Sequence, residues 1–361
     1  MGRDVTNEQR RRRTLFKPTP WAVVSWLIRS LPLSSLPATV QQARHLRMSL
    51  LRYSIAAALF VVFVFLALAA PGFFTASNLL NVLVNNFAIL AIVSLGMTLV
   101  ICSGGIDLSV GTAIDISSLV FVSLVAAKWD LRAALVAGCV GAAAVGAFNA
   151  FLIAPLRITP FLATLGTLFI GQSVQQLASN GGQPIYLVTG AIPGDFTFVG
   201  RGSFFGIPFP LVLDAVGAVV LFLLLQRSPY GRYILALGVQ PGVARYSGVR
   251  VQRVSALVYI LSAIGCGVAG IILSSTVKAY VPLSGNAYLL DSIGATFIGT
   301  TLHVEGRPSV QGTLVGVLLL SVVTNGLLLI GWNFYWQQVG TGVLIFLVLA
   351  ASFIGRRLRI R

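Results

Sequence analysis

The residues whose types and spacing can do chemistry gather in the stretch SGGIDLSVGT, which runs from Ser103 to Thr112 between two apolar runs. Glycine readily adopts the left-handed conformation that ends a helix, so Gly104 and Gly105 can terminate one helix. The side chains of Asp107 and Ser109 can accept hydrogen bonds from the free N–H groups at the start of the next. The stretch therefore predicts a helix end followed at once by a helix start.

Two placements of this stretch remain open. It is either a tight cytoplasmic turn between two membrane spans or a break inside the membrane, which is tolerated only where it faces a cavity or is buried in protein. A helix N-terminus that opens on a cavity can hold polar groups of a ligand. Asp107 is accordingly either a pathway residue or a helix cap. Asp115 lies near the same helical face, and is either pore-lining or bonded to a neighbouring hydroxyl.

The elements that position these residues must be membrane helices. Of the 361 residues, 57% are hydrophobic and 9% are charged, whereas a soluble domain has about 25% charged residues. So little polar surface cannot cover a water-soluble particle, and the predicted fold class is an all-α membrane protein. Ten apolar runs are candidate transmembrane helices: 54–74, 80–102, 110–127, 132–154, 160–178, 210–226, 254–274, 288–303, 312–330 and 336–354.

The basic residues predict the orientation of these spans. With ten spans and a cytoplasmic N-terminus, all but four of the 25 Lys and Arg residues fall on the cytoplasmic side, as the positive-inside rule requires. Both termini are therefore predicted to be cytoplasmic. The predicted organisation is a basic extension at 1–53, a transmembrane domain at 54–355 and a basic tail at 356–361. The net charge of +16 suits an anionic lipid surface rather than nucleic acid.

The sequence carries no catalytic or metal motif. Neither GxxxxGK[ST] nor GxSxG occurs, so no P-loop or serine-hydrolase elbow is present. His45 and His303 belong to no recognisable cluster, and the spacing of Cys102, Cys139 and Cys266 matches no metal site. The chain is predicted not to be an enzyme and to hold no cofactor.

Four ordered blocks carry a family resemblance. They are GGIDLSVG at 104–111, PFLATLGTLFIGQSV at 160–174, ALGVQPGVARYSGVRV at 236–251, and the block from YLLDSIGATFIGTT to NGLLLIG at 288–331. Together they resemble the permease subunits of bacterial sugar-type ABC importers, the ribose, xylose and galactose class. The chain departs from the family pattern where the usual Glu before Leu-Asp is replaced by Leu289-Leu290, which leaves Asp291.

This resemblance implies a permease subunit that imports a small polar solute, a sugar or sugar-like molecule, across the bacterial inner membrane. The implied partners are a cytoplasmic ABC ATPase that carries ATP and Mg, an extracytoplasmic solute-binding protein, and a second permease subunit, identical or related. The candidate residues of the transport pathway are Gly104, Gly105, Asp107, Ser109, Gly111, Phe161, Thr164 and Leu165.

Two of these groups have alternative explanations from packing. Phe161, Thr164 and Leu165 have the spacing of one helical stripe, on which an aromatic ring and a hydroxyl can contact a sugar. The alternative is packing between helices through Thr and Gly. The basic, acid-free segment 227–253 predicts a short helix that starts at Pro241, continues through Val243–Ser247 and stops at Gly248.

That short helix is a candidate for docking the ATPase, and a solvated loop carrying orientation charges is the alternative. The candidate docking residues are Gly238, Val243, Ala244, Arg245, Ser247 and Gly248. On the outer side, the segment 179–209 contains several Pro and Gly residues and is predicted to be an irregular loop with a short helix. It is a candidate landing surface for a binding protein.

Other functions remain open. A branched-chain amino acid or nucleoside permease of the same superfamily is the alternative at the level of the substrate. A stand-alone secondary transporter or channel is the rival class, which calls for coupling-ion carboxylates or an inverted repeat. The acids in or near the predicted spans are Asp107, Asp115, Asp214 and Asp291, and no internal repeat is evident in the sequence.

Overall fold

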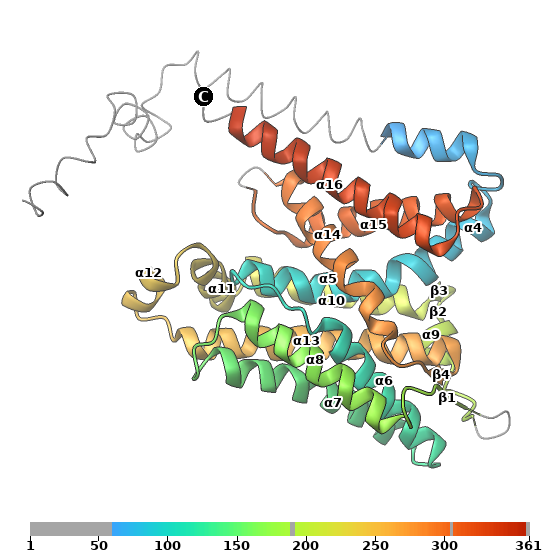
Figure 1. Ribbon diagram of the computed structural model, residues 1–361, viewed down its shortest axis with the longest axis horizontal. Coiled ribbons are helices and arrows are strands. Elements are labelled where there is room, and N and C mark those ends of the chain that lie inside the picture. The colour runs from blue at the N-terminus through green and yellow to red at the C-terminus, as the bar shows by residue number, and fades with distance from the viewer. Residues whose placement is uncertain (1–59, 188–191, 304–305, 359–361) are drawn as a thin grey trace, which may run out of the picture.

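The computed structural model describes residues 60–187, 192–303 and 306–358, and within them the protein is a bundle of helices (Figure 1). The predicted extension at 1–53 lies outside the described residues. Each of the ten predicted spans coincides with a helix, the first of them with a helical segment at 60–69. Five helices are long and apolar enough to cross a membrane, and shorter apolar helices accompany them. The structure thus supports an all-α membrane protein.

The remaining helices follow the segment 60–69 in this order along the chain. The first long span is α4 (Ala76–Asn81), the π-helical η2 (Val82–Phe87) and α5 (Ala88–Cys102) joined end to end. The next three are α6 (Val110–Ala126), α7 (Leu131–Ile153) and α8 (Pro160–Ala178). After a connecting region come α10 (Phe209–Gln226), α11 (Pro229–Val239), α12 (Pro241–Tyr246), α13 (Val251–Val277), α14 (Ala287–Leu302), α15 (Val310–Leu329) and α16 (Phe334–Leu358).

The two ends of the bundle carry different structures. At one, called the α12 end below, α11 and α12 lie beside the C-terminus of α5 (Figure 1). At the other, the β end, two short antiparallel strand pairs form. One joins β1 (Ile185–Tyr186) to β4 (Ala279–Tyr280), and the other joins β2 (Ser203–Phe204) to β3 (Ile207–Pro208). The four-residue α9 (Phe198–Arg201) lies between them, so the short helix predicted within 179–209 is confirmed.

The chain contains two units with the same order of elements. In the first, the 27-residue span Ala76–Cys102 is followed by a non-helical segment, then by α6, α7 and α8. In the second, the 27-residue α13 is followed by a connecting segment that contains β4 and the 3-10 helix η3 (Ser284–Asn286), then by α14, α15 and α16. Contacts repeat as well: α6 packs on α7 as α14 packs on α15, and the last helix of each unit contacts both.

The two units run in opposite directions. The C-terminal half of α5 shares a core cluster with the N-terminal part of α13, and the N-terminal half of α5 shares another with the C-terminal part of α13. The long helices that begin the two units, the span ending in α5 and α13, are therefore antiparallel. No repeat is evident in the sequence because the repetition lies in the order and contacts of the helices, not in the side chains.

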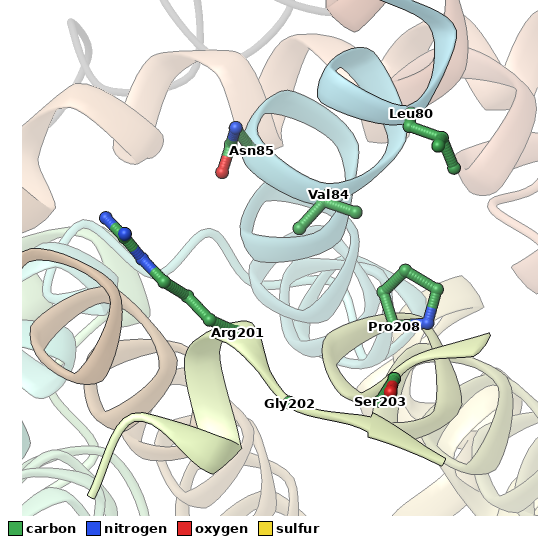
Figure 2. Close-up of a pocket in the computed structure, with 7 residues that line it drawn as sticks. All are labelled: Leu80, Val84, Asn85, Arg201, Gly202, Ser203 and Pro208. Carbon is green, nitrogen blue, oxygen red and sulfur yellow. The ribbon is translucent and has the colours of Figure 1, made fainter. Parts of the chain in front are cut away.

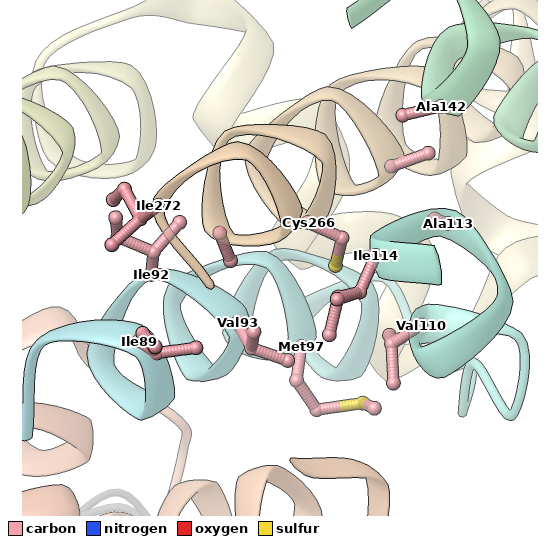
Figure 3. Close-up of a cluster of buried hydrophobic side chains, with 12 residues drawn as sticks. Ile89, Ile92, Val93, Met97, Val110, Ala113, Ile114, Ala142, Cys266 and Ile272 are labelled. Atoms are coloured by element: carbon pink, nitrogen blue, oxygen red, sulfur yellow. The ribbon is translucent and has the colours of Figure 1, made fainter. Parts of the chain in front are cut away.

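The centre of the bundle is an apolar cluster where α5, α6 and α13 cross (Figure 3). Val110, Ala113 and Ile114 from the start of α6 pack between the middles of α5 and α13, on side chains such as Met97 and Cys266. Val110 is 1% exposed and Met97 is fully buried. The start of α6 therefore lies inside the bundle, and not at either of its ends.

Candidate functional site

The glycine pair ends α5 as predicted. Gly104 has φ +86°, in the left-handed region that glycine tolerates best. Its N–H donates to the carbonyl of Ile101 at 3.0 Å, and the N–H of Gly105 donates to the carbonyl of Val100 at 3.2 Å. Gly104 is exposed at the α12 end and Gly105 is buried, so the chain turns inward between them.

Asp107 and Ser109 are buried and hold the chain where it enters the bundle. Asp107 Oδ1 accepts hydrogen bonds from the N–H of Ser109 at 2.8 Å and from its hydroxyl at 2.6 Å. The side chain of Ser109 makes no hydrogen bond to the N–H groups of α6. The prediction that Ser109 caps α6 is therefore wrong, because its hydroxyl is engaged by Asp107 and by the next helix of the unit.

A chain of polar side chains leads from that hydroxyl into α7 and α8. Asn149 Nδ2 donates to Ser109 Oγ at 2.7 Å, and Thr167 Oγ1 donates to Asn149 Oδ1 at 2.6 Å. Asn149 is fully buried and Thr167 is 4% exposed. Low local polarity strengthens such hydrogen bonds, so the segment 103–109 is fixed by side chains of its own unit.

The stretch has two parts within the bundle, and its placement relative to the membrane stays a prediction. The glycine pair is a turn at the α12 end, and Asp107 to Ser109 form a break inside the bundle, directly before α6. Of the other candidates, Thr164 is buried and its hydroxyl accepts from the N–H of Leu108 at 3.1 Å. Phe161 is 51% exposed, so the two do not present one surface. Their part in a solute pathway stays a prediction.

A second break lies in the other unit, at residues 281–286 between β4 and α14. Asp115 on α6 holds it, because its Oδ1 accepts from the N–H of Gly285 at 2.8 Å and from the hydroxyl of Ser284 at 3.1 Å. Gln175 on α8 holds it too, through Oε1, which accepts from the N–H of Leu283 at 3.1 Å. Asp115 is thus bonded to a neighbouring hydroxyl, one of its two predicted roles, and the partner comes from the opposite unit.

The second break contacts the first turn of α6 at a pair of glycines. A Cβ on Gly285 would lie 2.4 Å from the carbonyl oxygen of Gly111, and one on Gly111 would lie 2.9 Å from Asn286 Oδ1. No side chain fits between backbones this close, so the packing of the two backbones requires glycine at position 111. The N-terminus of α6 and that of α14 start from this contact and diverge, α6 towards the β end and α14 towards the α12 end (Figure 1).

The predicted docking helix forms almost as expected. α12 begins at Pro241 and ends at Tyr246, and Gly248 follows with φ +83°. Val243, Arg245, Ser247 and Gly248 are exposed, whereas Ala244 is 3% exposed and anchors the helix. Gly238 lies outside α12, in α11, where a Cβ would meet the carbonyl oxygen of Cys102 at 2.1 Å. Its position indicates packing against the end of α5, and its part in docking stays a prediction.

An open pocket of about 490 Å³ lies at the β end, between the π-helical turn and the segment that joins α9 to β3 (Figure 2). It is lined by Leu80, Val84, Asn85, Arg201, Gly202, Ser203 and Pro208. Arg201 and Asn85 offer hydrogen-bond donors to a polar solute. π-Helical turns occur frequently at functional sites, and the polar lining here accompanies one.

Several residues of the site escaped the sequence reading. Asn149 and Gln175 hold the two breaks, and the available signal was an amide side chain within an apolar run, which needs a partner in lipid. Tyr246 is 94% exposed and adds an aromatic side chain to the surface of α12. Within the described residues, no cluster of His, Cys, Asp or Glu could hold a metal ion.

Comparison with known proteins identifies the family of this chain. Residues 78–349 match the family described as branched-chain amino acid transport system / permease component. The chain belongs to this family. The permease is accordingly a multi-pass membrane protein, and the family is the membrane component of a transport system and not a catalytic subunit.

Several individual proteins are similar to this chain over most of its length. The permease is 34% identical to a ribose import permease protein of Bacillus subtilis over 80% of this chain and 88% of that protein. It is 33% identical to a ribose import permease protein of Escherichia coli K12 over 80% and 90% of the two chains. A galactofuranose transporter permease protein of the same organism is 31% identical over 74% and 77%. The family resemblance drawn from the four sequence blocks is thereby confirmed.

Proposed function

We propose that the chain is the permease subunit of an ATP-driven importer for a sugar or sugar-like solute. The names of its relatives support the solute class, since they include import permeases for ribose and a transporter permease for galactofuranose. A branched-chain amino acid, which the family description names, is the alternative substrate. In this proposal the transmembrane domain spans 54–355, crosses the bacterial inner membrane ten times and has cytoplasmic termini.

The α12 end is the proposed cytoplasmic face. Segment 227–253 has five arginines and no acid, and all five are exposed: Arg227, Arg232, Arg245, Arg250 and Arg253. Such an excess of positive charge beside membrane spans is typical of the cytoplasmic side. The β end is then outside, where both its open pocket and its strand pairs are available to an extracytoplasmic solute-binding protein. A second permease subunit, identical or related, would complete the pathway.

The single observation that carries coupling to ATP is the surface of α12. Ala244 anchors this helix while Val243 and Tyr246 project from it, 54% and 94% exposed. Exposed apolar and aromatic side chains on a short rigid helix are suited to a groove on another protein. ATP and Mg would be bound by that partner, a separate cytoplasmic ABC ATPase.

The test introduces acid into this surface without touching the core. In the doubly substituted chain Val243→Glu, Ser247→Glu, both changed residues are exposed, so the permease should fold and insert normally. We expect the ATPase to be lost from the purified complex and ATP-driven uptake to cease. The matched control is Tyr186→Glu at the β end, where Tyr186 is 70% exposed, and the control complex should retain its ATPase. Retention of the ATPase by both variants would refute the docking role of α12.

One observation meets an expectation stated for the rival class, a stand-alone secondary transporter. The two antiparallel units form the inverted repeat that such transporters often contain. The same repeat is compatible with an ATP-driven permease, so it no longer separates the two classes. The separating property is uptake without any ATPase, which the rival requires.

A further inference from the structure

The four acids in or near the spans differ in what surrounds them. Asp107 and Asp115 are buried and hydrogen-bonded within the described part of the chain. Asp214 on α10 is 5% exposed, and both carboxylate oxygens lack a hydrogen-bond partner in the described residues. Asp291 on α14 combines two features that the others do not: it is partly exposed, and the described residues give its carboxylate no hydrogen bond or ion pair.

Asp291 also lies within the predicted span 288–303, near the start of α14. It is the fifth residue of α14, about 6 Å from a helix start that is itself buried at the Gly111–Gly285 contact. About 16 Å of helix then separates it from the C-terminus of α14 towards the α12 end. Thr296, farther along the same helix, donates to the carbonyl of Ser94 in the middle of α5. The turn that carries Asp291 therefore lies between the two ends of the bundle, and not at either end.

The exposed side of α14 is confined to its first turns. Ala287 and Leu290 are exposed, Leu290 by 71%, and Asp291 shares their side of the helix in part. Farther along, α16 covers the helix, since a Cβ on Gly294 would lie 2.5 Å from the side chain of Ile345. In a membrane span, an acid on an uncovered side of a helix would be costly against lipid, and acids in spans instead face protein, water or a transported solute.

We propose that Asp291 lines the hydrophilic pathway of the permease, where its carboxylate accepts hydrogen bonds from hydroxyl groups of the solute. This inference rests on the proposed transport function and adds to it a residue that contacts the solute. A carboxylate only accepts hydrogen bonds, with several acceptor directions, and a sugar offers many O–H donors. Hydrogen bonds to a charged acceptor are the stronger kind, so Asp291 contributes to selecting hydroxyl-rich solutes.

The first experiment asks whether water reaches this position, and it needs no knowledge of the solute. In a chain whose Cys102, Cys139 and Cys266 are replaced by alanine, Asp291→Cys is treated in native membranes with the charged thiol reagent MTSES. This reagent reacts with the ionised thiol, which forms only in water. The matched control is Val219→Cys on α10, whose side chain is apolar, 57% exposed and therefore suited to face lipid.

We expect Asp291→Cys to react at least about ten times faster than Val219→Cys, in protein that inserts and elutes like the parent. Equal, slow reaction at both positions would overturn the proposal. A disulfide between two copies at 291, with slow reaction, would also overturn it, because it would assign this turn to contact between subunits.

The second experiment separates solute contact from structure. Using D-ribose as the probe in the complete transport complex, Asp291→Asn should raise the KM for uptake about tenfold or more and change kcat little, since the amide keeps one acceptor. Asp291→Leu should abolish uptake without lowering the yield of folded protein. An unchanged KM in Asp291→Asn would contradict the contact. Absence of ribose uptake in the parent chain would count against the sugar proposal alone, because the thiol experiment is read independently.

Discussion

The two breaks, at residues 103–109 and 281–286, occupy corresponding places in the two units but are held in different ways. The first is held by its own unit, through Asn149 and Thr167. The second is held by side chains of the other unit, Asp115 and Gln175. Consequently, a relative movement of the two units would leave the first break intact and release the second.

The two breaks also differ in the backbone φ angles of the residues at which they turn. The first break turns at Gly104, which adopts its positive φ at no steric cost. The second turns at Leu283, with φ +61°, and Lys278, at the end of α13 before β4, has φ +59°. Residues with side chains adopt such angles at a cost of about 1–2 kcal/mol each. The hydrogen bond from the N–H of Leu283 to Gln175 offsets part of that cost. The second break is therefore the one suited to change shape during transport.

The largest expected effect is at the contact between the second break and the first turn of α6. Gly285→Val places side-chain atoms against the backbone of Gly111, and we expect about 3 kcal/mol of destabilisation, the upper range for overpacking. Thermal unfolding in detergent measures it. Gly265→Val on α13 is the control, because nothing lies within 4 Å of a Cβ there. Similar melting of the two variants would mean that the second break does not contact the start of α6.

The next effect concerns the clamp between units. Asp115→Leu leaves the buried N–H of Gly285 without an acceptor, which costs about 1–3 kcal/mol. Hydrogen exchange measured by mass spectrometry should increase at residues 281–286 and stay unchanged at 103–109. Asp115→Asn keeps an acceptor oxygen and should exchange nearly as the parent does. Faster exchange at 103–109 in the leucine variant would contradict independent anchoring of the two breaks.

The reverse experiment weakens the first break. Asn149→Ala removes the link between Ser109 and Thr167, with an expected cost of about 1–2 kcal/mol. Exchange should now increase at 103–109 and remain at the parent level at 281–286. Thr167→Ser retains the hydroxyl and serves as the conservative control. If both segments respond together, the comparison drawn above is wrong.

The smallest effects distinguish the two turns. Gly104→Ala should destabilise by about 1–2 kcal/mol because alanine resists a positive φ. Lys278→Gly relieves the same strain but adds freedom to the unfolded chain, so its net effect should stay within about 1 kcal/mol. Melting temperatures of the two variants provide the comparison, and a large loss in Lys278→Gly would show that its side chain, rather than its backbone, matters.

Sequence patterns predicted the elements well and their contacts poorly. Pro241 and Gly248 predicted α12 because helix starts and stops depend on local backbone chemistry. The amphipathic α11 was missed within a basic segment, although Ile234 and Leu237 have helical spacing and are buried. The bond between Asp115 and Gly285 joins positions 170 residues apart, so no local pattern could reveal it. The opposed units were hidden for the same reason.

The most direct test of the account is uptake by the permease reconstituted in liposomes, with and without its ATPase and binding protein. D-Ribose and D-galactose are offered as probes, with MgATP supplied on the side of the ATPase. We predict that a sugar enters only when the permease, the ATPase, the binding protein and hydrolysable ATP are all present. Sugar uptake by the permease alone, at the same rate with or without ATP, would contradict the account and identify the chain as a stand-alone transporter.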